Sequence, residues 1–213
     1  MRRSIFGALS VLLFFSTSVL GQSSGFYFGG GVTYSDAVSN TGPWDEDRFD
    51  ANSDHFGLNA LIGYEVPTSS IPLAFEFGVD IPMGADFEVN SISCDTAVIG
   101  PYLCTADAIL RARVIAHLNL SERTDLVFGL GYGALFGESG VDTGETDSVI
   151  LGGVTASFGV QFELDNAARV RALTTYDRFN QILEEPCQSG AFPNCWDPEY
   201  DAVSVELSYI VPF

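Results

Sequence analysis

The chain has 213 residues and a formal net charge of −19, and all nine of its basic residues are arginines. Nucleic acids and anionic lipid headgroups are bound mainly through lysine and arginine, so this charge balance disfavours both as direct partners. Charged residues make up only 17% of the chain, whereas hydrophobic residues make up 46% and aromatic residues 13%. Burial of that much apolar surface can offset the entropy lost on ordering, which argues against an intrinsically disordered chain.

The N-terminal segment has the features of a cleavable export signal. Arg2 and Arg3 form a positively charged start, the stretch from Ile5 to Leu20 is mostly apolar, and Gly21 offers a small residue at the cleavage point. The apolar stretch is short for a membrane-spanning helix, and no later segment approaches about 18 consecutive apolar residues. No cysteine lies near the cleavage point, so we expect no lipoprotein anchor. We predict a signal peptide at residues 1–21 and one mature domain at residues 22–213.

Eight segments of the mature domain alternate large apolar residues with small or polar residues. They span residues 26–34, 56–64, 73–81, 110–119, 126–136, 150–163, 169–177 and 203–213. A period of two residues is typical of a β-strand whose two faces meet different surroundings. The clearest case is 73–81, where Glu76 and Asp80 lie on the face opposite five large apolar residues. The sequence therefore predicts an all-β protein with eight strands.

The segments and their connections have the dimensions of a membrane barrel. About ten residues at about 3.3 Å each, tilted by about 40°, cover the roughly 25 Å apolar band of an outer membrane, whereas strands of soluble sandwiches commonly have about five or six residues. The long connections are 36–52, 84–106, 137–148 and 180–199, and the short ones are 66–71, 121–125 and 165–168. This alternation predicts long extracellular loops, short periplasmic turns and both termini in the periplasm.

A sheet can span lipid only when it is closed, because lipid offers no water to unpaired backbone groups. We therefore expect the apolar face outside and the polar face in the lumen; a soluble barrel or sandwich with the opposite arrangement is the alternative. An eight-stranded lumen is just wide enough to be filled by side chains, and buried charges need partners. We predict that Asp80 lies near Arg111 and Arg113, Glu76 near His117, and Glu163 near Arg169 and Arg171.

Four cysteines fall into two close pairs within the predicted long loops. In an exported protein an even count favours disulfides, and four cysteines allow three connectivities. We favour Cys94–Cys104 and Cys187–Cys195, each of which closes one local loop. A zinc site would need shorter cysteine spacing or nearby histidines, and both histidines lie elsewhere. Disulfides are therefore favoured over a metal.

The two ends of the mature domain carry a family resemblance. It opens with a glycine-rich stretch at 25–31, and its closing strand at 203–213 ends on Phe213 after apolar or aromatic residues at alternate positions. With the strand count, these features resemble the OmpA-like and opacity-protein-like surface antigens of Gram-negative outer membranes, over the whole mature chain. Pro212 departs from the pattern, but at a strand end it removes little pairing.

The resemblance implies a closed eight-stranded antiparallel up-and-down transmembrane β-barrel in the cell outer membrane. It also implies that the C-terminal strand ending at Phe213 is the signal presented to the barrel-assembly machinery. Longer members of the group carry a peptidoglycan-binding domain after the barrel. This chain shows no counterpart of that domain, so we do not expect a cell-wall anchor.

No residue pattern indicates catalysis, a cofactor or a dedicated metal site. His117 is expected to be a hydrogen-bonding group in the lumen near the periplasmic end. His55 lies near Ser53 and Asp54, but adjacent strand residues point to opposite faces, and a catalytic arrangement needs groups that converge within hydrogen-bond reach.

The acidic segment with Asp45, Asp47 and Asp50 lacks the spacing of an EF-hand. At most we expect weak binding of divalent cations there, bridging the acidic loops and lipopolysaccharide.

The expected function is that of a non-enzymatic, monomeric surface barrel with an envelope-structural role, in contact with outer-membrane lipid and lipopolysaccharide. One alternative is a narrow pore for ions or small solutes, which a lumen full of charged side chains disfavours. The other is an adhesin that binds host or surface ligands through loops 36–52 and 180–199, which carry Trp44, Phe192 and Trp196.

Overall fold

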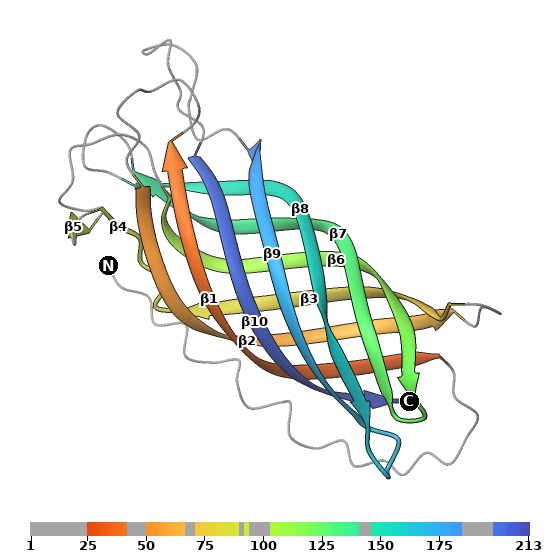
Figure 1. The fold of residues 1–213 in the computed structure, drawn as a ribbon. Coiled ribbons are helices and arrows are strands. Elements are labelled where there is room, and N and C mark those ends of the chain that lie inside the picture. The colour runs from red at the N-terminus through yellow and green to blue at the C-terminus, as the bar shows by residue number, and fades with distance from the viewer. Residues whose placement is uncertain are drawn as a thin grey trace.

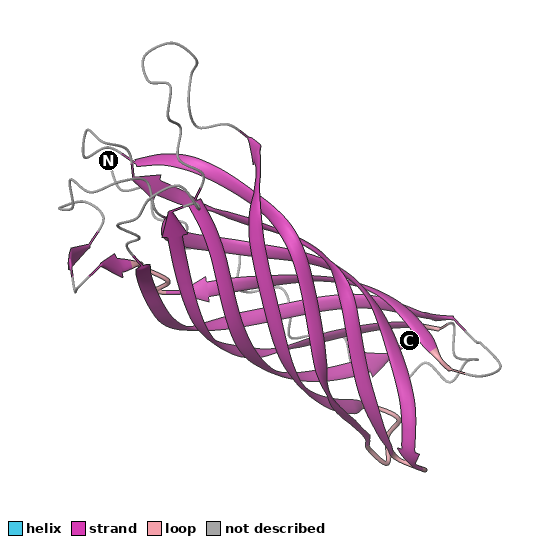
Figure 2. Cartoon of the chain, turned by 45° about the horizontal axis from the view of Figure 1, so that its top comes forward, coloured by secondary structure: helices cyan, strands magenta, loops and turns pink. Residues whose placement is uncertain are grey.

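The computed structural model describes residues 25–41, 50–66, 71–89, 92–93, 103–140, 146–184 and 198–213. Every regular element within these residues is a β-strand (Figure 2). In this part of the chain no helix has the length and apolar character needed to cross a membrane. The predicted signal peptide at residues 1–21 and the central parts of the predicted long loops lie outside the described residues.

Eight long strands form a closed antiparallel barrel (Figure 1). They are β1 (Phe26–Thr41), β2 (Asp50–Val66), β3 (Leu73–Met83), β6 (Leu103–Ser121), β7 (Thr124–Gly140), β8 (Thr146–Glu163), β9 (Arg169–Glu184) and β10 (Pro198–Pro212). Each pairs with its neighbours in chain order, and β1 pairs with both β2 and β10, which closes the sheet. The predicted fold is confirmed, and each of the eight alternating segments corresponds to one strand, except that Phe213 follows the end of β10.

Two short strands, β4 (Glu88–Val89) and β5 (Ile92–Ser93), follow β3. After β3 the chain bends at Gly84, whose φ of 73° is a conformation that glycine adopts without steric cost. Beyond the bend, the backbone N–H of Phe87 donates to the carbonyl of Cys104, and Glu88 pairs with Asn52. This segment therefore lies between β2 and β6, as β3 does before it. Part of the predicted loop 84–106 is barrel wall.

The two ends of the barrel differ in their connections. At the first, here called the turn end, residues 122–123 join β6 to β7 and residues 164–168 join β8 to β9. Phe213 also lies there, and its N–H donates to the carbonyl of Phe26. At the opposite loop end, the predicted long loops 36–52, 137–148 and 180–199 are all shorter than expected. β1 runs to Thr41 and β2 begins at Asp50, and β9 runs to Glu184 and β10 begins at Pro198. β7 and β8 stay paired up to Gly140 and Thr146, so only residues 141–145 lie between them. Residues at these strand ends are mostly small or polar on both faces, so their sequence shows no alternation that would have predicted the longer strands.

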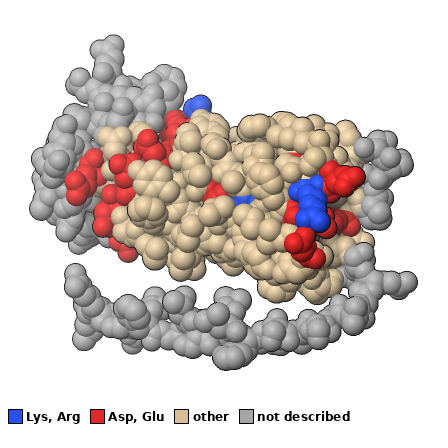
Figure 3. All heavy atoms as spheres, turned by 60° about the horizontal axis from the view of Figure 1, so that its bottom comes forward, with Lys and Arg blue, Asp and Glu red and all other residues tan. Residues whose placement is uncertain are grey.

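The barrel has an apolar exterior, as predicted, and a lumen in which buried polar side chains alternate with apolar clusters. Large hydrophobic side chains point outward from all eight strands, with Leu130 70% exposed and Phe56 62% exposed. On the face that Figure 3 shows, the middle of the barrel is mostly uncharged, and most of the visible acidic and basic groups lie towards the two ends. A continuous apolar surface of this kind is foreign to soluble monomers and suits a lipid environment.

The inward positions carry most of the buried charge. The buried ionic side chains of the strands are Glu76, Asp80, Arg111, Arg113, Arg171, Asp177 and Glu206. In a soluble barrel these inward positions would be filled mainly by apolar residues. The soluble alternative is therefore wrong.

Small residues in the wall make room for large luminal side chains. A Cβ atom built on Gly63 would lie 2.1 Å from Cζ of Tyr27, so the tyrosine ring occupies the space that the missing side chain leaves. In that position the Tyr27 hydroxyl donates to Glu76 at 3.1 Å. Gly63 thus fixes the position of a ring that reaches into the charged lumen.

Gly63→Ala is expected to destabilise the folded barrel by about 1–3 kcal/mol, because Tyr27 must move to relieve the overlap. Urea titration of the barrel in lipid vesicles, with the folded fraction read as the unboiled gel band, measures the loss. Gly78→Ala is the matched control, since a Cβ at this inward position meets no atom closer than 3.6 Å. Equal losses in the two variants would contradict the role assigned to Gly63.

Candidate functional site: the lumen of the barrel

Glu76 is the centre of an ionic network that crosses the lumen. It projects inward from β3, and its two carboxylate oxygens accept hydrogen bonds from Arg113 of β6 at 2.5 Å and Arg171 of β9 at 2.7 Å. Glu206 of β10 lies 3.5 Å from Arg113 and 3.7 Å from Arg171. Tyr27 of β1 completes the shell around Glu76. Five strands are therefore connected through one buried cluster.

A second ionic layer lies closer to the loop end. Arg111 of β6 donates to Asp177 of β9 through Nε at 3.1 Å and through Nη2 at 2.6 Å. Its Nη1 lies 3.5 Å from Asp80 of β3, and Asp80 also accepts a hydrogen bond from the Thr33 hydroxyl at 2.9 Å. Two donors from one guanidinium to one carboxylate give both strength and a fixed orientation.

The predicted ion pairs are partly confirmed. Asp80 does contact Arg111, whereas Arg113 pairs with Glu76 and Glu206. The placement of Glu76 near His117 is wrong, because Glu76 pairs with arginines and His117 faces Asp125, with 3.8 Å between Nδ1 and Oδ2. Strands in a closed barrel are tilted and staggered, so counting residues from the strand ends misjudges which levels meet across the lumen.

The third predicted cluster, Glu163 with Arg169 and Arg171, is also only partly confirmed. Glu163 pairs in register with Arg169, as expected from adjacent strand ends. Arg169, however, forms a bidentate ion pair with Glu65 of β2. The sequence did not predict this pair. Arg171 is directed to Glu76 instead of Glu163.

An apolar layer that the sequence did not predict fills the lumen at the loop end. The ring of Tyr200 stacks on Phe179 at a centroid distance of 5.5 Å and meets the edge of Phe87 at 6.1 Å. All three side chains are buried, in a cluster that includes Leu103 and Leu135. Phe87 and Tyr200 lie in or beside predicted loops. Phe179 could have been predicted, because it lies two residues after Asp177 and alternate residues of a strand share one face.

Ser53 and His55 share the inward face of β2, with 3.4 Å between Oγ and Nδ1. Asp54 between them is exposed on the outer face, as the strand geometry predicts. In the described part of the chain no carboxylate is hydrogen-bonded to His55, so the third member of a catalytic triad is absent there.

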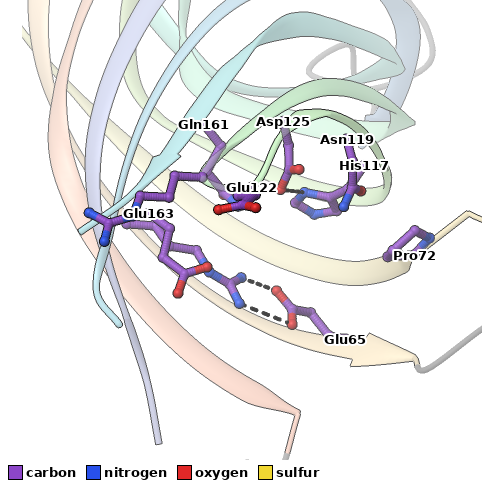
Figure 4. Close-up of a pocket in the computed structure, with 10 residues that line it drawn as sticks. Glu65, Pro72, His117, Asn119, Glu122, Asp125, Gln161 and Glu163 are labelled. Atoms are coloured by element: carbon purple, nitrogen blue, oxygen red, sulfur yellow. Dashed lines mark hydrogen bonds and ion pairs between the residues drawn. The ribbon is translucent and has the colours of Figure 1, made fainter. Parts of the chain in front are cut away.

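A cavity of about 180 Å³ lies at the turn end of the lumen. Figure 4 shows His117 facing Asp125 on one side of it and the Glu65–Arg169 ion pair on another. The cavity is called the turn-end cavity below.

The remaining candidate residues are only partly described. Cys104 is buried and disulfide-bonded, whereas the other three cysteines lie outside the described residues, so the favoured pairing stays a prediction. Trp44, Asp45, Asp47, Phe192, Trp196 and the side chain of Asp50 also lie outside them. Within the described residues no group of three or more His, Cys, Asp or Glu side chains is arranged to hold a metal ion.

Comparison with known protein families identifies the barrel. The sequence model of a family described as the outer membrane protein beta-barrel domain matches residues 7–210. This chain belongs to that family. Membership places the barrel in the outer membrane of a Gram-negative cell and confirms the resemblance drawn from the sequence at the level of the barrel family. No curated protein matches the chain.

One solved structure shares the fold, and two others match this chain with TM-scores below 0.5. Neisserial surface protein A (NspA) is 12% identical with a TM-score of 0.56, and the match covers 89% of this chain and 98% of that one. AlkL, solved in lipid bilayers, is 15% identical with a TM-score of 0.45 and coverages of 94% and 97%. Ail, the attachment invasion locus protein of Yersinia pestis, is 14% identical with a TM-score of 0.43 and coverages of 86% and 98%.

Proposed function

We propose that this chain is a non-enzymatic surface barrel with a structural role in the outer membrane. The observation that carries the proposal is the filled lumen. From the loop end inward, the lumen holds the apolar layer around Tyr200, then the ionic layer around Arg111, and then the ionic network around Glu76. A barrel filled in this way is a rigid membrane-spanning body.

The ionic layers disfavour the pore alternative. A solute that passes Glu76 has to displace contacts of 2.5 Å and 2.7 Å to two arginines. Separating buried charge partners is costly, since each is left without compensation in a low-dielectric interior. The apolar layer adds a barrier to ions, because it offers no groups to replace their hydration shells.

In the proposed orientation the loop end is extracellular and the turn end is periplasmic. Short turns on the periplasmic side and longer connections outside are the rule in bacterial outer membrane barrels. The acidic loops then face lipopolysaccharide, with divalent cations as weak bridging ligands. The C-terminal strand is available to the assembly machinery from the periplasmic side, and the barrel acts as a monomer.

Single-channel recording in planar bilayers tests the proposal. We expect the refolded mature protein to insert without long-lived conductance steps, while the same preparation shows a faster-moving unboiled band on a detergent gel that boiling abolishes. The gel establishes that the inserted protein is folded. Reproducible open levels from protein that passes the gel test would replace the structural role with a pore.

A further inference from the structure

The turn-end cavity lies in the lumen, whereas a larger hollow of about 330 Å³ lies on the outer face of the barrel wall. It crosses β2, β3 and β6, which are neighbours in the sheet (Figure 1). Its lining reaches from Phe26, at the start of β1, to Ala112, in the middle of β6. This hollow is called the outer groove below.

The strand pairing explains the floor of the outer groove. Gly63 of β2 is paired with Glu76 of β3, and Glu76 is paired with Arg113 of β6. All three residues face the lumen, and the side chains of Glu76 and Arg113 are only 0% and 3% exposed. The floor is therefore strand backbone. Because successive residues of a strand point to opposite faces, the residues on either side of this row point outward and form two walls.

Each wall is a row of paired, outward side chains. The wall towards the turn end consists of Phe26, Tyr64 and Phe75. The wall towards the loop end consists of Ile62, Phe77 and Ala112. The rings of Phe26 and Tyr64 are in contact, with 4.7 Å between their centroids. Ala112 is the smallest member of its row, so the wall is lowest in the middle of the barrel.

The surroundings of the outer groove are apolar. Among the described residues of its lining only Glu76 and Arg113 are charged, and both side chains are directed into the ionic network of the lumen. The groove is continuous with the lipid-facing surface of a barrel whose family belongs to the outer membrane. Its reach from the turn end of β1 to the middle of β6 matches one leaflet of the bilayer.

We propose that the outer groove holds one acyl chain of a phospholipid from the leaflet at the turn end. Lipid chains are as apolar as the side chains that they meet, so van der Waals packing decides which contacts are favoured inside a membrane. A chain between the two walls gains close contacts on both sides that a chain on the flatter surface lacks. This inference rests on the membrane location of the barrel and is independent of whether the barrel conducts.

Retention of lipid by the purified barrel tests the proposal. The full mature protein is refolded in vesicles of palmitoyl-oleoyl-phosphatidylcholine, transferred to cholate, a detergent without a long flexible chain, and separated by gel filtration. We expect one phospholipid per monomer, measured as lipid phosphorus. Phosphatidylglycerol with the same chains should be retained equally, because the chain makes the contacts. Dihexanoyl-phosphatidylcholine, which keeps the headgroup and shortens the chains, should not be retained.

A variant that fills the outer groove locates the bound chain. Ala112→Phe places a ring between the two walls and is expected to weaken retention about tenfold, which corresponds to about 1.4 kcal/mol of binding. Ala156→Phe is the matched control. Ala156 also points outward between two larger residues, Leu130 and Tyr176, but it is not part of the groove. It should retain as much phospholipid as the parent protein.

A second pair of variants removes ring contacts instead of adding them. Phe77→Ala takes away part of one wall and should also weaken retention. Phe158→Ala is its control, because Phe158 lies on β8, outside the groove, and is 52% exposed against 50% for Phe77. Folding of all four variants is checked by the boiling-dependent gel shift.

The proposal is overturned if barrel that passes the gel test retains no phospholipid, or if Ala112→Phe and Ala156→Phe retain equal amounts. Retention that depends on the headgroup and not on chain length would contradict an acyl chain as the occupant. A dimer that Ala112→Phe converts to a monomer would assign the groove to a second copy of this chain instead.

Discussion

Replacing Glu76 with leucine is expected to destabilise the barrel by about 3–5 kcal/mol, the loss found when one partner of a buried ion pair is removed. The variant leaves the guanidinium groups of Arg113 and Arg171 in the lumen without their shortest contacts. Glu206 remains within 3.5 Å of Arg113 and 3.7 Å of Arg171, so we expect the loss at the lower end of that range. Tyr27 also loses the acceptor of its hydroxyl proton.

Urea titration in lipid vesicles measures this loss, with the folded fraction followed on unboiled gels. Glu65→Gln is the control, because Glu65 belongs to an ion pair at the rim whose two side chains are 31% and 20% exposed. Partial exposure screens that pair, and its removal should cost no more than about 1 kcal/mol. Similar losses in the two variants would show that the network around Glu76 is not the main electrostatic support of the fold.

A double-mutant cycle separates the pair from general disruption of the lumen. Arg171→Met alone leaves Glu76 with Arg113, and combining it with Glu76→Leu removes one of the stranded charges. The double variant should therefore lose less than the sum of the single losses, by about 0.5–3 kcal/mol. Strict additivity would contradict direct coupling between Glu76 and Arg171.

The faces of the strands could be predicted from the sequence because the pleat of a strand is a local property. Alternation in 73–81 is sufficient to place Glu76 and Asp80 inward and Phe75 outward, and the structure agrees. The closed barrel follows from the same pattern, since a sheet with one fully apolar face can be stable in lipid only without free edges.

The contacts across the lumen could not be predicted in the same way. They depend on the stagger between strands far apart in the sequence, such as β3 and β9, which meet at Glu76 and Arg171. The buried position of Phe87 could not be predicted for another reason. It follows the bend at Gly84, in a segment too short to show a period of its own. His117 was correctly expected to be luminal and near the strand end, but its missing hydrogen-bond partner is visible only in the structure.

Leu130→Arg is expected to cost about 2–4 kcal/mol, the penalty of an arginine on the lipid face near the midplane of a bilayer. Leu130 lies near the middle of β7 and faces outward, beside Val114 of β6 and Ala156 of β8. The matched control is Leu120→Arg. Leu120 is also strongly exposed, 59% against 70% for Leu130, but it lies next to the β6–β7 turn, where the penalty should fall to about 0–1 kcal/mol.

The comparison is decisive because the two leucines differ in depth and hardly in exposure. In water, an arginine at either position would be solvated and both variants would keep the stability of the parent protein. In a bilayer, only the central position forces the guanidinium to reach past several apolar residues to the nearest headgroup. Urea titration of both variants in vesicles therefore measures the position of the apolar band. Equal losses at the two sites would contradict a membrane centred on the middle of β7.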